Sequence, residues 1–223
     1  MRIVKILMIL TLSFVAFDYA DAQNLNVDFG SAHGTPSNTF GAASGQVGTW
    51  NTLGLGTTSG LLDITGAATT VAVTVTSQTD TGSSGGSCGG DLGALLDDNF
   101  YTSGATWSVD LSGLTNGNYS VYLYGPNHTG VETGNMVVNG VAVASISGDG
   151  CSFIAGTTHT AIQVSVTNGT LSIAGTNIAS FAGLGGLQLI EQALPGVGNS
   201  YVFPPFPAIC GVPGASFPCL PEG

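Results

Sequence analysis

The residues of this chain with the clearest chemical potential are acidic and have no basic counterparts. Arg2 and Lys5 are its only basic residues apart from histidine, whereas all 13 carboxylates lie beyond them. Such carboxylates must be solvated, hydrogen-bonded or bound to a cation. Asp97-Asp98-Asn99 groups two carboxylates with an amide, and Asp28 lies near the first predicted strand. Because hard cations prefer these oxygen ligands, we interpret the set as a candidate calcium site, with an acidic solvated turn as the alternative.

Aromatic side chains supply a second candidate site. Flat rings stack on the apolar faces of sugars, and polar groups beside them bond the hydroxyls. Two of the tyrosines alternate with the apolar row of residues 119–123, so their rings should point away from that row. The predicted ligand-binding residues are Trp50, Tyr101, Tyr122, Tyr124 and His128. The alternative is that the tyrosines pack beneath loops and that the tryptophan belongs to the core.

Hydrolase motifs are weak in this chain. Gly82-Ser83-Ser84-Gly85-Gly86 matches the nucleophile motif G-x-S-x-G, but it lies in a Gly/Ser-rich loop rather than between a strand and a helix. The three histidines are scattered along the sequence. Asp97 and Asp98 are neighbours, so on a strand they would point to opposite faces and not share the cleft that glycoside hydrolysis needs. We therefore expect no enzyme.

The N-terminus predicts export. Residues 1–22 contain a short basic region, an apolar run from Ile6 to Phe17 and the cleavage-site pattern Ala20-Asp21-Ala22, which is the order of a signal peptide. The apolar run is too short to span a bilayer, so we expect no membrane insertion after its removal and a secreted or cell-surface protein. A chain without Lys or Arg beyond this segment cannot neutralise phosphates, which excludes nucleic-acid binding.

Four cysteines in an exported chain predict two disulfides. Three connectivities are possible, and we favour Cys88–Cys151 with Cys210–Cys219. The first would tie the Gly/Ser-rich segment 79–93 to the rest of the domain, and the second would close a small loop. No C-x-x-C pair occurs, which disfavours a metal site built on the cysteines.

Alternating apolar and polar residues predict an all-β domain. The alternation recurs from Leu25 to Ile190, and only the signal peptide carries a helical period. Asn139-Gly140 and Asn168-Gly169 each separate two predicted strands, as the turn of a two-residue hairpin does. About ten short strands predict a two-sheet antiparallel β-sandwich, or jelly roll, over residues 23–193. Prolines predict an irregular tail over residues 194–223.

Four segments, taken in order, resemble a known family. They are Asn26-Val27-Asp28-Phe29-Gly30, residues 111–124 (LSGLTNGNYSVYLY), Val137-Val138-Asn139-Gly140 and Gly186-Leu187-Gln188-Leu189. This order is similar to the galactose-binding-domain-like jelly-roll modules of bacterial secreted and cell-surface proteins, over residues 24–192. The resemblance implies a β-sandwich. Modules of this family often bind carbohydrate and many hold a structural calcium ion, while others join domains or mediate adhesion.

Two functions follow as expectations. The first is a non-catalytic extracellular carbohydrate-binding module, stabilised by calcium, whose partner is a polysaccharide or a surface glycan. The second is a structural or adhesive subunit of an extracellular matrix, surface layer or filament. Such a subunit would assemble with copies of itself by exchanging a strand or the tail. The Thr/Gly-rich composition and the proline-rich tail motivate this second function.

Overall fold

The computed structural model describes residues 23–77, 81–83, 87–128, 130–148, 150–178 and 180–192. The predicted signal peptide, the tail from residue 194 and the predicted Cys210–Cys219 bridge lie outside these residues. Within the described ranges, no helix has the length and apolar character needed to cross a bilayer.

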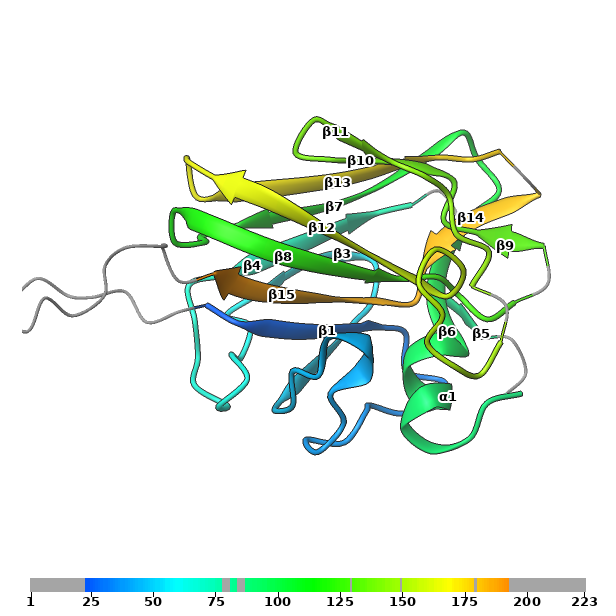
Figure 1. The fold of residues 1–223 in the computed structure, drawn as a ribbon, viewed down its shortest axis with the longest axis horizontal. Coiled ribbons are helices and arrows are strands. Elements are labelled where there is room, and N and C mark those ends of the chain that lie inside the picture. Colours follow the sequence, from blue (N-terminus) through cyan, green and yellow to red (C-terminus); the bar gives the residue numbers. More distant parts are fainter. Residues whose placement is uncertain are drawn as a thin grey trace, which may run out of the picture. The chain divides into compact units, whose positions relative to one another are not determined.

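The described residues form an all-β sandwich of two large sheets, which confirms the predicted fold class (Figure 1). The first sheet has five strands in the order β12-β8-β15-β1-β2. These are β12 (His159–Val166), β8 (Gly117–Tyr124), β15 (Gly186–Gln192), β1 (Leu25–Phe29) and β2 (Trp50–Leu53). All neighbours in this sheet are antiparallel except β1 and β2, which are parallel.

The second large sheet has six strands in the order β11-β10-β13-β7-β4-β3, and all its neighbours are antiparallel. They are β11 (Val141–Val143), β10 (Asn135–Val138), β13 (Thr170–Thr176), β7 (Thr106–Ser112), β4 (Ala72–Thr76) and β3 (Gly56–Ser59). Strict alternation of buried and exposed residues along β13 and β7 turns one apolar row of each strand toward the five-stranded sheet. Trp107 of β7 lies in this interior and is 2% exposed.

A smaller four-stranded sheet lies at one end of the sandwich, on the right in Figure 1. Its strands, in order, are β5 (Thr81–Ser83), β6 (Asp98–Thr102), β14 (Phe181–Leu184) and β9 (Val131–Glu132). Only Gly185 separates β14 from β15, so one run of chain passes from the small sheet into the five-stranded sheet. A Cβ at Gly185 would lie 2.6 Å from the carbonyl oxygen of Leu95, which leaves room for glycine alone.

The sequence predicted no helix after the signal peptide, and the structure shows that this prediction is wrong. Helix α1 spans Gly90–Leu96 and buries Ala94, Leu95 and Leu96, while a short 3₁₀ helix, η1, spans Ala42–Ser44. Seven residues are too few to produce a visible helical period, and the glycines around α1 predicted a loop. Tertiary burial of its apolar residues stabilises such a short helix.

The Asn-Gly turns have two different roles. Asn139-Gly140 forms the predicted two-residue hairpin between β10 and β11, with φ values of 46° and 83°. The hairpin predicted at Asn168-Gly169 is wrong, because β12 belongs to the five-stranded sheet and β13 to the six-stranded sheet. This turn carries the chain across the sandwich instead. The amide of Gly169 donates to the side chain of Asn116, which lies in the connection from β7 to β8.

The favoured disulfide Cys88–Cys151 is confirmed. It joins the start of α1 to the segment before β12, across 63 residues of sequence. Closing a loop of that length removes conformational freedom from the unfolded chain, an effect worth about 4 kcal/mol in the chain-entropy account.

Candidate functional site

The small sheet forms one side of a cavity of about 280 Å³. Its described lining residues are Gly82, Asn99, Tyr101, His128, Val131 and Phe181. They come from β5, β6, β14 and β9 and from the segment that precedes β9. The cavity therefore depends on the pairing of four strands that are far apart in the sequence.

Alternation along β6 decides which side chains reach this cavity. Asn99 and Tyr101 are two residues apart and both line it, whereas Phe100 between them is buried in the sandwich core. The rings of Tyr101 and Phe181 lie 5.6 Å apart between centroids, with an interplanar angle of 84°. This edge-to-face pair makes two apolar walls that meet at nearly a right angle.

The position of the Tyr101 ring depends on a glycine in the neighbouring strand. Gly82 pairs with Asn99 in the register of β5 and β6. A Cβ at position 82 would lie 2.6 Å from Cε1 of Tyr101, closer than atoms of a side chain can approach. The tyrosine ring therefore packs against the backbone of β5, and a larger residue there would displace it.

The structure brings two of the five predicted ligand-binding residues together. Tyr101 and His128 both line the cavity, where they are joined by Asn99, which we had assigned to the metal site. The other three lining residues, Gly82, Val131 and Phe181, were missed, and Phe181 supplies the second aromatic wall. Its segment shows little alternation, and only its position beside Tyr101 in the folded sheet reveals its role.

The other three predicted aromatic residues lie elsewhere. Trp50 is 6% exposed and Tyr124 is fully buried, in a second cluster with Leu95 and Leu96. The indole nitrogen of Trp50 donates to the carbonyl of Phe40 (3.1 Å). Tyr122 is half-buried and its ring stacks on His159, with centroids 6.4 Å apart. Trp50 and Tyr124 consequently present no face to a ligand in this structure.

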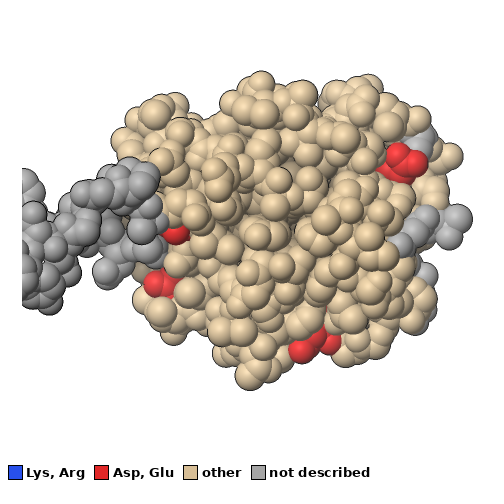
Figure 2. All heavy atoms as spheres, in the orientation of Figure 1, with Lys and Arg blue, Asp and Glu red and all other residues tan. Residues whose placement is uncertain are grey.

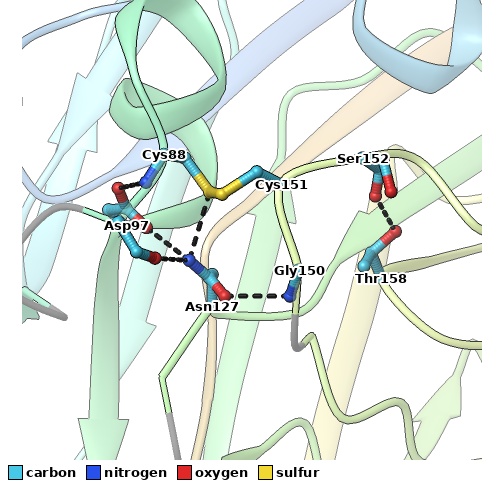
Figure 3. Close-up of a disulfide and its surroundings, with 8 residues drawn as sticks. Cys88, Asp97, Asn127, Gly150, Cys151, Ser152 and Thr158 are labelled. Atoms are coloured by element: carbon cyan, nitrogen blue, oxygen red, sulfur yellow. Dashed lines mark hydrogen bonds between the residues drawn. A yellow bond between two sulfur atoms is a disulfide. The ribbon is translucent and has the colours of Figure 1, made fainter.

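The predicted metal ligands also separate. Asp97 supports the disulfide, as Figure 3 shows. It accepts hydrogen bonds from the amide of Cys88 (2.8 Å) and from Nδ2 of Asn127 (2.7 Å), and Asn127 in turn accepts from the amide of Gly150 (2.9 Å). This network joins the two loops that the Cys88–Cys151 bridge connects, so the structure gives Asp97 a structural role.

Asp28 and Asp98, in contrast, lie close together inside the protein. Both are fully buried. One oxygen of Asp28 accepts from the hydroxyl of Thr52 (3.2 Å), and one oxygen of Asp98 accepts from the amide of His33 (2.7 Å). The second oxygen of each carboxyl, Oδ1, has no hydrogen-bond partner. Buried polar atoms without a partner are rare and costly, so this pair marks a special environment.

Burial raises the pKa of Asp28 to about 9, against the lowering effect of the Thr52 hydrogen bond, and the charge of Asp98 raises it further. Burial also raises the pKa of Asp98. Without another ligand, the carboxyl of Asp28 therefore holds a proton at neutral pH, because burial disfavours its charged form and the nearby charge of Asp98 adds to that effect.

The pair also has the donor chemistry of a hard-cation site. Thr52, which bonds Asp28, and Gly30, which packs against Asp98, both line an open cavity of about 140 Å³. Neither carboxyl lines this cavity, but the two orphan carboxylate oxygens and the hydroxyl of Thr52 are ligands of the type that calcium prefers. Within the described ranges, no three His, Cys, Asp or Glu residues gather around one point, so other ligands would have to be neutral oxygens.

Comparisons with known proteins give little guidance. No family model matches the chain, and no curated protein matches it. One solved structure, the GH26-CBM35 β-(1,4)-mannanase of Podospora anserina, is 19% identical to it, with a TM-score of 0.28. The match covers 55% of this chain and 25% of the mannanase. A likeness this weak carries no argument about function.

The protonated Asp28 generates a prediction about pH. A carboxyl whose pKa is near 9 when folded and near 4 when unfolded stabilises the protein below pH 4. That contribution is lost progressively as pH rises toward 9, by up to about 1.4 kcal/mol per pH unit. In chelator, the melting temperature should fall from pH 5 to pH 9, and Asp28→Asn should flatten this dependence because an amide does not titrate.

Asp110→Asn is the matched control, since Asp110 is exposed on β7. Its melting profile should keep the slope of the unmodified protein. Parallel profiles for Asp28→Asn and the unmodified protein would show that Asp28 is not the group responsible.

Proposed function

We propose that this protein is a non-catalytic carbohydrate-binding module that acts outside the cell. The observation that carries the proposal is the cavity with two perpendicular aromatic walls, Tyr101 and Phe181, and the polar side chains of Asn99 and His128. A pyranose has an apolar C–H face and a rim of hydroxyls, so it matches a site with aromatic walls and a few polar groups.

The lining also supports a binding role rather than catalysis. Glycoside hydrolysis ordinarily needs a pair of carboxyl groups on either side of the sugar bond. None of the described residues that line the cavity is a carboxylate. Two carboxylates are adjacent in sequence to lining residues: Asp98 is fully buried on the opposite side of β6, and Glu132 accepts a hydrogen bond from the hydroxyl of Ser145.

An extracellular location is consistent with the covalent structure. The Cys88–Cys151 bridge needs an oxidising compartment to persist, and the predicted signal peptide would deliver the chain to one.

Substitution at the aromatic walls tests this proposal. Tyr101→Ala and Phe181→Ala should each weaken glycan binding by about tenfold to a hundredfold, because each removes roughly 1.5–3 kcal/mol of apolar contact. The protein is first screened on a glycan array, and the affinity for the best glycan is then measured for each variant by calorimetry.

Tyr122→Ala is the matched control, because it removes another half-buried tyrosine, on β8, that does not line the cavity. Its affinity should equal that of the unmodified protein. A protein that retains no glycan on the array would contradict the proposal. So would glycan binding that Tyr122→Ala weakens as much as Tyr101→Ala does.

We also propose that calcium stabilises the module through Asp28 and Asp98. A bound cation would replace the proton that otherwise neutralises this pair, and it would give both orphan oxygens a partner. Calcium should therefore compete with protons and bind better as pH rises.

Calcium at a hundredfold excess over its Kd should raise the melting temperature by roughly 5–10 °C at pH 8, and chelator should reverse this. The rise should be smaller at pH 5. Asp28→Asn and Asp98→Asn should abolish it, whereas Asp97→Asn, which weakens the disulfide network, should keep it. A response lost only in Asp97→Asn would place the cation elsewhere.

A specific observation favours the second candidate function, a self-assembling adhesive subunit. Both edge strands of the six-stranded sheet lack charged residues: β3 is exposed along its whole length, and at the other edge Val141 of β11 is 49% exposed, beside Val137 of β10 at 44%. Exposed edges without charge, proline or a covering loop are templates for pairing with another chain.

If copies assemble through these edges, the size measured by light scattering should grow with protein concentration, and Val141→Lys should prevent the growth by charging the edge. Val47→Lys is the matched control, because Val47 is 53% exposed but lies outside the strands. A protein that stays monomeric at high concentration would remove this function.

A further inference from the structure

We propose that the aromatic cavity takes a single neutral sugar ring, at the end or a branch of a glycan, and discriminates against acidic sugars. This inference rests on the proposed carbohydrate-binding function and specifies its ligand. Three features of the cavity carry it: the charge of its surroundings, the angle between its walls and its size.

Among the described residues that line the cavity, His128 is the only one whose side chain can carry a positive charge. No Lys or Arg occurs in residues 23–223, and Figure 2 shows a face with a few separate carboxylates among uncharged side chains. The two acidic residues adjacent in sequence to lining residues, Asp98 and Glu132, do not themselves line the cavity. A uronic acid would therefore bring its carboxylate into a site with no Lys or Arg to pair with it, and it would lose hydration without that compensation.

The angle between the walls limits how a glycan can lie. Coplanar aromatic rings make a flat platform on which several sugar rings of a chain can stack in sequence. The rings of Tyr101 and Phe181 are instead 84° apart, so they form a corner. One pyranose can place a face on one ring and an edge on the other, but an extended chain cannot follow both walls.

The size of the cavity agrees with this geometry. Its volume of about 280 Å³ lies at the lower limit of ordinary small-molecule pockets, which span roughly 300–1,000 Å³. His128 places an imidazole at the cavity, while Asn99 is 2% exposed and its amide nitrogen donates to the carbonyl of Phe100, so few polar groups remain for the hydroxyls of more than one ring. Sugar units beyond that ring would extend into solvent and add little affinity.

Calorimetric titration of the mature protein tests the inference. The probes are methyl glycosides of galactose, glucose and mannose, the matching methyl glycuronides, and neutral tetrasaccharides of the same sugars. At least one neutral methyl glycoside should bind, its glycuronide should bind more than fivefold more weakly, and its tetrasaccharide should bind less than fivefold more tightly. Phe181→Ala, a substitution at the partly exposed wall, should weaken the methyl glycoside and the tetrasaccharide by the same factor.

The outcomes distinguish a failure of this inference from a failure of the proposed function. A glycuronide within fivefold of its neutral partner, or tighter, would overturn the discrimination against acids. A tetrasaccharide gain of fivefold or more would overturn the single-ring assignment, and so would methyl glycoside binding that Phe181→Ala leaves unchanged. In each of these cases the protein still binds glycans, so carbohydrate binding itself stands, although binding that Phe181→Ala leaves unchanged would place the site outside this cavity. If no probe binds and the glycan array is also blank, the proposed function itself fails.

Discussion

The structure depends on one compositional constraint: the sandwich has no lysine or arginine with which to neutralise a carboxylate. Its acidic side chains are satisfied by hydroxyls and amides instead. Ser37 donates to Asp91 through both its amide and its hydroxyl, and Ser108 and Ser172 both donate to Asp110. The many serines and threonines of the chain therefore do work that basic residues do in most proteins. The buried pair Asp28 and Asp98 is an exception to this pattern, because one oxygen of each carboxyl has no hydrogen-bond partner.

A single strand links that pair to the aromatic cavity. Successive side chains of β6 point to opposite sides, so Asp98 faces Asp28 in the interior while Asn99 lies at the cavity with Tyr101. Whatever neutralises the two carboxyls, whether a proton or a cation, acts within one residue of a lining side chain. The buried pair and the cavity therefore share strand β6, on its two opposite faces.

On the face of the five-stranded sheet that points away from the six-stranded sheet, amide side chains bind the segment around η1 to strands β15 and β1. Gln188 of β15 accepts from Ser44 (2.8 Å) and from the hydroxyl of Tyr124, and it donates to Asn26 of β1 (2.9 Å). Gln46 donates to the same oxygen of Asn26 (2.8 Å). These bonds hold the segment around η1 against this face of the sheet. Because the segment covers the face, Tyr124 is buried. Each buried amide in the network is paired, so the cover costs little in desolvation.

The sequence by itself determined which face of each strand is apolar, the hairpin at Asn139-Gly140 and the preference for the Cys88–Cys151 bridge. These follow from local rules: alternation, positive-φ turn residues and the small number of pairings that the cysteines allow. It could not show that the Asn168-Gly169 turn crosses between sheets, because the turn chemistry is the same whether the following strand pairs with its predecessor or with a distant one.

Some aromatic residues point away from the apolar row of their strand, and only the tertiary structure decided which of these stay accessible. Alternation places Tyr122 and Tyr124 on the same side of β8, but the loop that covers that side buries one and leaves the other half-buried. Likewise, no local pattern pairs Phe181 with Tyr101, 80 positions earlier, and they meet because β14 and β6 are neighbours in the small sheet. Faces of strands are encoded over a few residues, whereas the contacts that make or cover a site come from segments brought together by strand order. Strand order is a property of the whole chain.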